Sequence, residues 1–271
     1  MSISSILIGD EYRKLGLTET SPTSAMAAYE TSGPMFTRDE ILEAITDSTW
    51  VKAAEVFGDA WIKDQDGVGA CAGYAAASAM ERARAKRGLV YVELSGDGIY
   101  AAVNRGVDQG SGLENNMVWL RDNGIPPAEL VPRYEFRKSR IPAKAYEEGK
   151  RFKGYECYSV NSELALASSI VAGYSTVIAV HAGNGGRSPD GLIDWQNGVG
   201  NHSVCCDDLR YRNNTIEFQI PNSWGLKWGE RGRGWLRWAS HLSNPSKNHM
   251  FYAIRSTIDD SKSDNPPVPK E

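Results

Sequence analysis

Cys71 ends a polar, glycine-containing loop (64–70) and directly precedes a run of helix-forming residues that Gly88 closes. Glycine is the usual residue just past the end of a helix, so the pattern predicts a helix that begins at this cysteine. Unpaired backbone N–H groups and the positive end of the helix dipole favour a thiolate at such a position. A lone cysteine in a tight turn is more often a small packing residue. The rest of the chain must therefore decide between a nucleophile and a structural thiol.

A cysteine nucleophile needs a base, a group that orients the base, and donors for an oxyanion. His202 follows a glycine-rich loop and begins a predicted strand, and Asn222 lies 20 residues further on, in the segment Pro-Asn-Ser-Trp-Gly. An amide at the end of one strand can orient an imidazole at the start of its neighbour, and Trp224 can shield that hydrogen bond from water. These three residues are therefore the candidate partners of Cys71.

Other reactive or charged residues have simpler interpretations. His181 lies at a strand end without a signature around it, and His241 and His249 are expected at the surface. Cys205 and Cys206 alternate along a strand and are expected to be packing residues. The basic residues near the end of the predicted helix are expected to be solvated; they are Arg82, Arg84, Lys86 and Arg87.

The order of predicted elements indicates two lobes of an α+β chain, helical first and β-rich second. We expect an N-terminal extension (1–45), a short pro-segment or arm, and then a catalytic domain (46–255) and a disordered tail (256–271). Within the domain, residues 64–150 are predicted to be mainly helical and residues 151–255 mainly β. In the extension, Thr37 and Glu40 form a capping-box pattern that predicts a short helix through Ile45. A cleft between two such lobes is a usual place for a site.

The composition is that of an ordinary globular protein, with 41% hydrophobic and 24% charged residues in 271. A net charge of −4 gives no electrostatic reason to expect nucleic acid or an anionic membrane as a partner. The four cysteines form no C-x-x-C pair, so neither a metal site nor another cofactor is expected. No secretory signal and no apolar run of roughly 20 residues is visible, which favours a cytoplasmic protein.

Three separated segments resemble those of the papain-like cysteine peptidases. They are the loop from Gln65 to Cys71, Asn201-His202-Ser203-Val204, and Asn222-Ser223-Trp224-Gly225 followed by Trp228-Gly229-Glu230. His202 and Asn222 follow Cys71 by 131 and 151 residues, and the family spacing is roughly 130–150. A weaker match is Gly110-Ser111-Gly112, which resembles the family's glycine-rich cleft wall.

The resemblance implies a helical left lobe with its central helix starting at the nucleophile, an antiparallel β-barrel as right lobe, and an active-site cleft between them. It implies Cys71 as nucleophile, His202 as base and acid, and Asn222 as the residue that orients His202. Gln65 and the backbone N–H of Cys71 would bind the oxyanion, and the resting state would be a thiolate–imidazolium pair. The implied substrate is a peptide or protein, bound near three residues: Gly112, Leu113 and Trp224. The implied enzyme is a thiol endopeptidase that works through a thioester.

Two departures from the family pattern leave alternatives open. Ala72 stands where the family has an aromatic residue, and Asp66 stands where it has a glycine. These substitutions are consistent with a weak or inactive papain-fold protein of a larger assembly, such as a phage virion. A third alternative is transfer of the acyl group to an amine rather than to water. The extension is shorter than a typical inhibitory propeptide, and the sequence predicts neither an oligomeric state nor a peptide preference.

Overall fold

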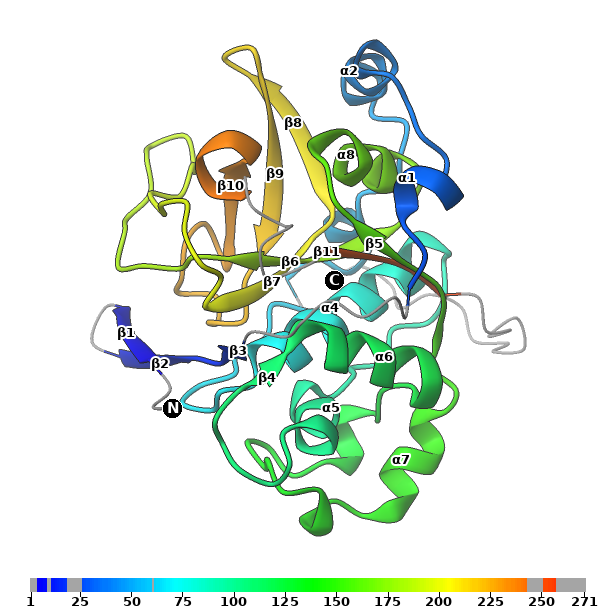
Figure 1. Ribbon diagram of the computed structural model, residues 1–271, viewed down its shortest axis with the longest axis vertical. Helices are drawn as coiled ribbons and strands as arrows, with labels where there is room; N and C mark the ends of the chain where they lie inside the picture. Colours follow the sequence, from blue (N-terminus) through cyan, green and yellow to red (C-terminus); the bar gives the residue numbers. More distant parts are fainter. Residues whose placement is uncertain (1–3, 9–10, 19–25, 60, 243–250, 257–271) are drawn as a thin grey trace.

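The structure is a computed structural model that describes residues 4–8, 11–18, 26–59, 61–242 and 251–256 (Figure 1). The predicted C-terminal tail and His249 therefore lie outside the described residues, apart from Ser256. The described N-terminal part contains a hairpin, a short strand and two helices: β1 (Ser4–Ile8), β2 (Glu11–Leu15), β3 (Leu17–Thr18), α1 (Tyr29–Ser32) and α2 (Arg38–Asp47). The capping box at Thr37 is present, since its hydroxyl accepts from the backbone N–H of Glu40 and the Glu40 carboxylate accepts from that of Thr37.

The next part of the chain is helical, as the sequence predicts. Its elements are α3 (Ala53–Phe57), α4 (Cys71–Lys86), α5 (Gly96–Val103), β4 (Ser111–Gly112), α6 (Leu113–Asn123), α7 (Ala143–Gly149) and two short 3₁₀ turns at Ala128–Leu130 and Lys138–Arg140. The central helix α4 begins at Cys71, and Gly88 follows its end with a φ of 70°. The predicted start and stop of this helix are thus confirmed.

The remaining chain is β-rich. Its elements are β5 (Gly154–Val160), α8 (Glu163–Val171), β6 (Ser175–Val180), β7 (His202–Cys206), β8 (Asp208–Arg212), β9 (Thr215–Pro221), β10 (Arg233–Arg237), a π-helical turn at Trp238–Leu242 and β11 (Phe251–Ser256). The strands form two antiparallel sheets, in the orders β5-β11-β6-β7 and β10-β9-β8. Among the described strands these sheets do not close into a barrel, so the papain-like fold is confirmed without the closed barrel that the resemblance implied.

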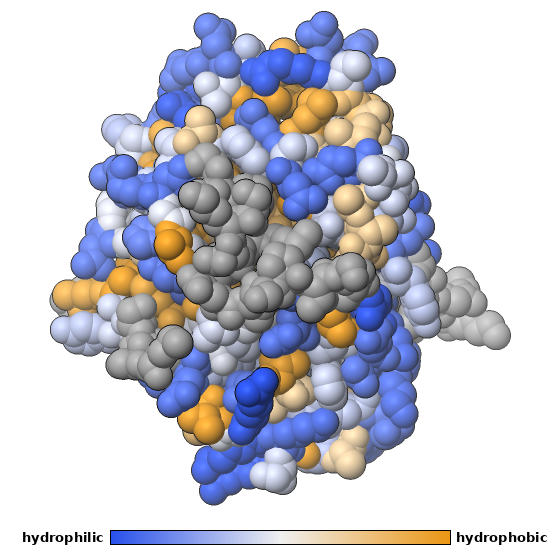
Figure 2. Space-filling model, viewed as in Figure 1, coloured by the Kyte–Doolittle hydropathy of each residue, from blue (hydrophilic) through white to orange (hydrophobic). Residues whose placement is uncertain are grey.

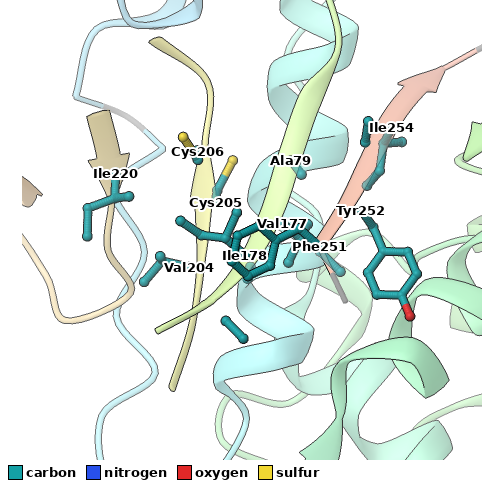
Figure 3. Close-up of a cluster of buried hydrophobic side chains, with 14 of the residues drawn as sticks. Ala79, Val177, Ile178, Val204, Cys205, Cys206, Ile220, Phe251, Tyr252 and Ile254 are labelled. Atoms are coloured by element: carbon teal, nitrogen blue, oxygen red, sulfur yellow. The ribbon is translucent and has the colours of Figure 1, made fainter. Parts of the chain in front are cut away.

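Helix α4 lies between the two parts of the molecule. It packs against α5 and α6 on one side and against β6, β7 and β11 on the other (Figure 1). Figure 3 shows Ala79 of α4 in one apolar cluster with Ile178 of β6 and Val204 of β7. The cluster also contains Cys205 and Cys206, which are packing residues as predicted, although both are fully buried. None of the helices in the described ranges is long and apolar enough to cross a bilayer.

Two of the four basic residues that were predicted to be solvated, Arg82 and Arg84, are buried, whereas Lys86 is half-buried and Arg87 is exposed as predicted. Arg82 is 0% and Arg84 4% exposed, because elements of both lobes cover the helix along its length. Arg82 makes a 2.7 Å ion pair with Asp207 and lies over the ring of Trp61. The prediction failed for Arg82 and Arg84 because a run of basic residues in the sequence does not show which distant elements pack against it.

We expect Asp207→Ala to destabilise the protein by about 3–5 kcal/mol, because the Arg82 guanidinium would stay buried without its counter-ion. Urea unfolding followed by circular dichroism measures this loss. The matched control is Glu148→Ala, which breaks a 3.6 Å pair with exposed Arg151 and should cost about 1 kcal/mol or less. Equal losses for the two variants would contradict the assignment of Arg82–Asp207 as a buried pair.

Candidate active site

Cys71 is the first residue of α4 and its side chain is fully buried. Burial raises the pKa of the thiol to about 11, although the backbone N–H groups of Ser203 and Gly16 lie close enough to favour the thiolate. Ser203 follows His202 at the start of β7, so the packing of α4 on β7 brings the predicted nucleophile and base together. Gly16 belongs to the N-terminal segment, which no local pattern linked to the site.

His202 and Asn222 form a hydrogen bond of 2.8 Å between Nε2 and Oδ1. The backbone N–H of Ser223 also donates to this Oδ1, at 2.8 Å. Because a backbone N–H can only donate, the amide oxygen is fixed on that side, and Nε2 of the imidazole must carry the hydrogen. Nδ1 then has the free lone pair, and no hydrogen-bond partner for it exists among the described residues. The predicted pairing of histidine and asparagine is thus present with a defined tautomer.

Aromatic rings enclose this hydrogen bond. Trp224 stacks on His202 with 4.5 Å between ring centroids and an interplanar angle of 25°. Trp195 meets the imidazole edge-on at 6.3 Å, and Trp228 packs against both tryptophans. Trp224 therefore has the shielding position predicted for it. Trp195, from the glycine-rich loop before β7, was not singled out by the sequence and has no motif that marks it.

The side chain of Gln65 is held from both ends. Its Oε1 accepts from the Ser223 hydroxyl at 2.6 Å, and its Nε2 donates to the carbonyl of Val68 at 2.9 Å. Its backbone N–H donates to the Ser223 carbonyl at 2.9 Å. Ser223, which sequence reasoning had not assigned a role, thus fixes the amide group that was predicted to bind the oxyanion.

The chain's own N-terminal segment passes over Cys71. The carbonyl of Lys14 accepts a second bond from Gln65 Nε2 at 3.2 Å. The carbonyl of Gly16 accepts from the N–H of Ser111 at 2.9 Å, and the N–H of Leu17 donates to the carbonyl of Asn201 at 3.2 Å. The segment is therefore bonded to the helical part through Gln65 and Ser111 and to the β-rich part through Asn201. Figure 1 shows the hairpin β1–β2 at the side of the molecule, with β3 leading inward to β4.

Gly112 lies in a strand pair with an extended segment of the chain itself, strand β3. Strands β3 and β4 pair in parallel, with Leu17 opposite Ser111 and Thr18 opposite Gly112. Leu113 is not at the surface of a pocket, since it is 1% exposed in the main apolar core at the start of α6. The structure thus brings Gln65, Cys71, His202, Asn222, Trp224 and Gly112 to one place and puts Leu113 behind it.

With this segment in place, burial opposes the predicted thiolate–imidazolium pair. The pKa of His202 falls to about 4, because burial disfavours the imidazolium more than the bond to Asn222 favours it. The raised pKa of Cys71 has the same cause. The closed arrangement therefore favours a neutral thiol and a neutral imidazole, whereas the resemblance implied a thiolate–imidazolium pair. The reason is that the sequence could not show how completely the pair is covered.

Asp66 has a left-handed backbone with a φ of 48°, a conformation that glycine adopts without strain and aspartate tolerates. Its backbone N–H donates to Oδ1 of Asp64 at 2.9 Å, which stabilises the turn. Its carboxylate faces Arg13, at 3.3 Å from Nη1. The departure from the family glycine is therefore compatible with the loop and connects it to the N-terminal segment.

The other candidate residues lie away from this site. His241 is 7% exposed and its Nε2 bonds the carbonyl of Ile193, so the prediction of a surface position was wrong. His181 bonds the carbonyl of Val199 and takes no part in the site. Within the described ranges, no group of His, Cys, Asp and Glu could hold a metal ion.

The comparison with protein families is decisive. The family model of the papain family cysteine proteases matches residues 51–253. The chain belongs to this family. A search of the curated proteins gave no match.

Among solved structures, xylellain, a cysteine protease from Xylella fastidiosa, has a TM-score of 0.70 at 19% identity. The match covers 89% of this chain and 96% of xylellain. A procathepsin B from Trypanosoma congolense has a TM-score of 0.61 at 14% identity, with 89% of this chain and 87% of that chain covered. These likenesses show the papain-like fold, and family membership supports a cysteine peptidase.

We expect His202 to take up its proton near pH 4, well below the ordinary value near 6.5. Carbon-detected NMR of the imidazole measures this, with the signal assigned from the spectrum of His202→Asn. Because the unfolded chain binds this proton more readily, His202 should lower the stability as the pH falls from about 6.5 to 4. A midpoint at or above 6.5 would contradict the burial of the closed pair.

Proposed function

We propose that the protein is a cysteine endopeptidase that uses Cys71 as nucleophile, His202 as base and acid, and Asn222 to orient His202. The observation that carries the proposal is the fixed tautomer of His202, with Nε2–H on Asn222 and a free lone pair on Nδ1. An inactive relative would have no need of an asparagine amide held by a backbone N–H in the one orientation that frees this lone pair.

The proposed reaction begins when His202 Nδ1 accepts the Cys71 proton and the sulfur attacks the carbonyl carbon of the scissile bond. The C–S bond forms while the carbonyl π electrons move to oxygen, which the amide of Gln65 and the backbone N–H of Cys71 stabilise. Collapse breaks the C–N bond, and the imidazolium gives its proton to the leaving amine. Water, deprotonated by His202, then hydrolyses the thioester and restores the thiol.

The position of Lys14 supports the role of Gln65. A carbonyl oxygen of the chain itself already accepts a hydrogen bond from Gln65 Nε2. The site therefore can take a peptide carbonyl at this amide. Ser223 holds the amide from the other side, so the donor is oriented before a substrate binds, as electrostatic catalysis requires.

The course of the same segment supports cleavage within a chain rather than at an end. Residues 11–18 comprise β2 and β3. They run past Gln65 and Cys71, and β3 then pairs with β4. A site that accommodates continuous chain on both sides of the nucleophile suits an endopeptidase.

We expect the full-length protein to hydrolyse an internally quenched peptide library, and Cys71→Ala to abolish hydrolysis. An epoxide-type thiol inhibitor should label Cys71, as mapped by mass spectrometry, and His202→Ala should prevent the labelling. Gln65→Ala should lower kcat about 10²–10³-fold, the usual effect of removing one oxyanion donor. Cys157→Ala is the matched control for a buried thiol outside the site, and it should keep full activity. Hydrolysis that survives in Cys71→Ala would refute the proposal.

A further inference from the structure

Asp108 lies in the loop between α5 and β4, and its carboxylate bonds two parts of the helical region at once. Its Oδ1 accepts from the backbone N–H of Gly69 at 2.9 Å and from the hydroxyl of Tyr100, also at 2.9 Å. Its Oδ2 pairs with Lys14 at 2.5 Å. Gly69 stands two residues before Cys71, so a single oxygen of Asp108 connects the loop of the proposed nucleophile to α5.

The bond at Gly69 acts on the proposed oxyanion donor through one peptide group. The N–H of Gly69 and the carbonyl of Val68 belong to the same peptide group, which is planar and rigid. This carbonyl accepts from Gln65 Nε2 at 2.9 Å. The peptide group is held at its N–H by Asp108, so it presents its carbonyl to Gln65 in a fixed direction. One hydrogen of Nε2 is thus bound to Val68, which directs the other towards the place that the carbonyl of Lys14 now takes.

Tyr100 extends the network to the start of β4. Its oxygen accepts from the backbone N–H of Gly110 at 2.9 Å, which leaves the hydroxyl hydrogen for Asp108. The side chain is 0% exposed, and burial raises the pKa of the phenol, so the hydroxyl keeps its proton and the direction of both bonds is fixed. Gly110 directly precedes β4, the strand that pairs with β3. Through Tyr100, Asp108 therefore also holds the backbone to which an extended segment is added.

The loop that carries Asp108 has little apolar packing to hold it. In residues 104–110 the only apolar side chain is that of Val107, and it is 50% exposed. On the face shown in Figure 2, the helical part at the bottom of the view is mainly hydrophilic, with scattered hydrophobic residues. Polar bonds therefore position this loop, and Asp108 supplies the one that joins it to Gly69.

We propose that Asp108 is a positioning residue of the site, which holds Gln65 and the glycine wall (residues 110–112) in register with each other. The proposal rests on the proposed function, because it assigns roles in the same site. Asp108 touches no reacting atom, and its effect on the reaction passes through the Val68–Gly69 peptide group and through Tyr100. Because one oxygen accepts both bonds, an amide oxygen at this position can replace the carboxylate.

Three variants of the full-length protein separate these roles in peptide hydrolysis. Asp108→Ala removes both bonds and should lower kcat about 10–100-fold, because Gln65 loses its fixed direction. Asp108→Asn should recover most of this loss, since its Oδ1 can accept from Gly69 and Tyr100 although the ion pair with Lys14 is lost. Tyr100→Phe should raise KM about 3–10-fold with kcat nearly unchanged, which is the factor expected for one lost hydrogen bond to the glycine wall.

The matched control is Tyr74→Phe. Tyr74 also donates a buried hydroxyl bond to a carboxylate, that of Asp97, at 3.0 Å, and this bond reaches neither Gln65 nor the glycine wall. The variant should therefore change neither kcat nor KM. Tyr100→Phe differs from the wild type by one oxygen atom, so the KM measurement still tests the network if Asp108→Ala does not fold.

Amide hydrogen exchange, followed by NMR, measures the two backbone bonds without any catalysis. The amide of Gly69 should exchange at least about tenfold faster in Asp108→Ala than in the wild type, because its acceptor is gone. In Tyr100→Phe the amide of Gly110 should show this acceleration and that of Gly69 should not. In Asp108→Asn both amides should stay protected.

Two outcomes would overturn the assignment. In the first, Asp108→Ala frees the amide of Gly69 but keeps the kcat of the wild type. In the second, Asp108→Asn is as impaired as Asp108→Ala, which would assign the effect to the pair with Lys14. The exchange rates are independent of the proposed peptidase. The expected exchange pattern in a protein that hydrolyses no peptide would support the network and count against the enzyme.

Discussion

The site depends on the pairing of two loops that are far apart in the sequence. Asp64 and Trp224 form an antiparallel bridge, Gln65 donates to the Ser223 carbonyl, and Gly225 donates to that of Lys63. Gly225 has a φ of 73°, and a Cβ there would approach the Asp64 carboxylate to 2.8 Å. This close backbone contact joins the loop that ends at the nucleophile to the segment that orients the base. It lets one residue, Ser223, fix both the Gln65 amide and the oxygen of Asn222.

Helix α4 gives this pairing a rigid base. Its buried ion pairs, Arg82 with Asp207 and Glu81 with Lys63, connect it to the β-rich part and to the segment that leads into the Gln65 loop. A helix covered by both lobes cannot shift its first residue without breaking these pairs. The precision of the site therefore comes from burial of the helix, and the same burial raises the pKa of Cys71.

The N-terminal segment covers Cys71 and so affects the charge state of Cys71 and His202. Full burial favours a neutral thiol and a neutral imidazole, whereas the family's chemistry calls for a thiolate. Hydration of the pair would lower the cost of charge separation, while the helix N-terminus and the N–H of Ser203 favour the thiolate. Burial and hydration of Cys71 and His202 thus have opposite effects on the charge state of the pair.

The sequence by itself determined the residue types of the site, the start of α4 and the order of helical and β-rich parts. These follow from local patterns: a helix stop at Gly88, the Asn-Ser-Trp-Gly segment, and glycine-rich loops before the strands. Only the tertiary structure decided that residues 11–18 cover Cys71, that Arg13 pairs with Asp66, and that Arg82 is buried. Each of these depends on what packs against a residue from a distant part of the chain. Burial and long-range ion pairs have no period or spacing in the sequence, so no local pattern could have predicted them.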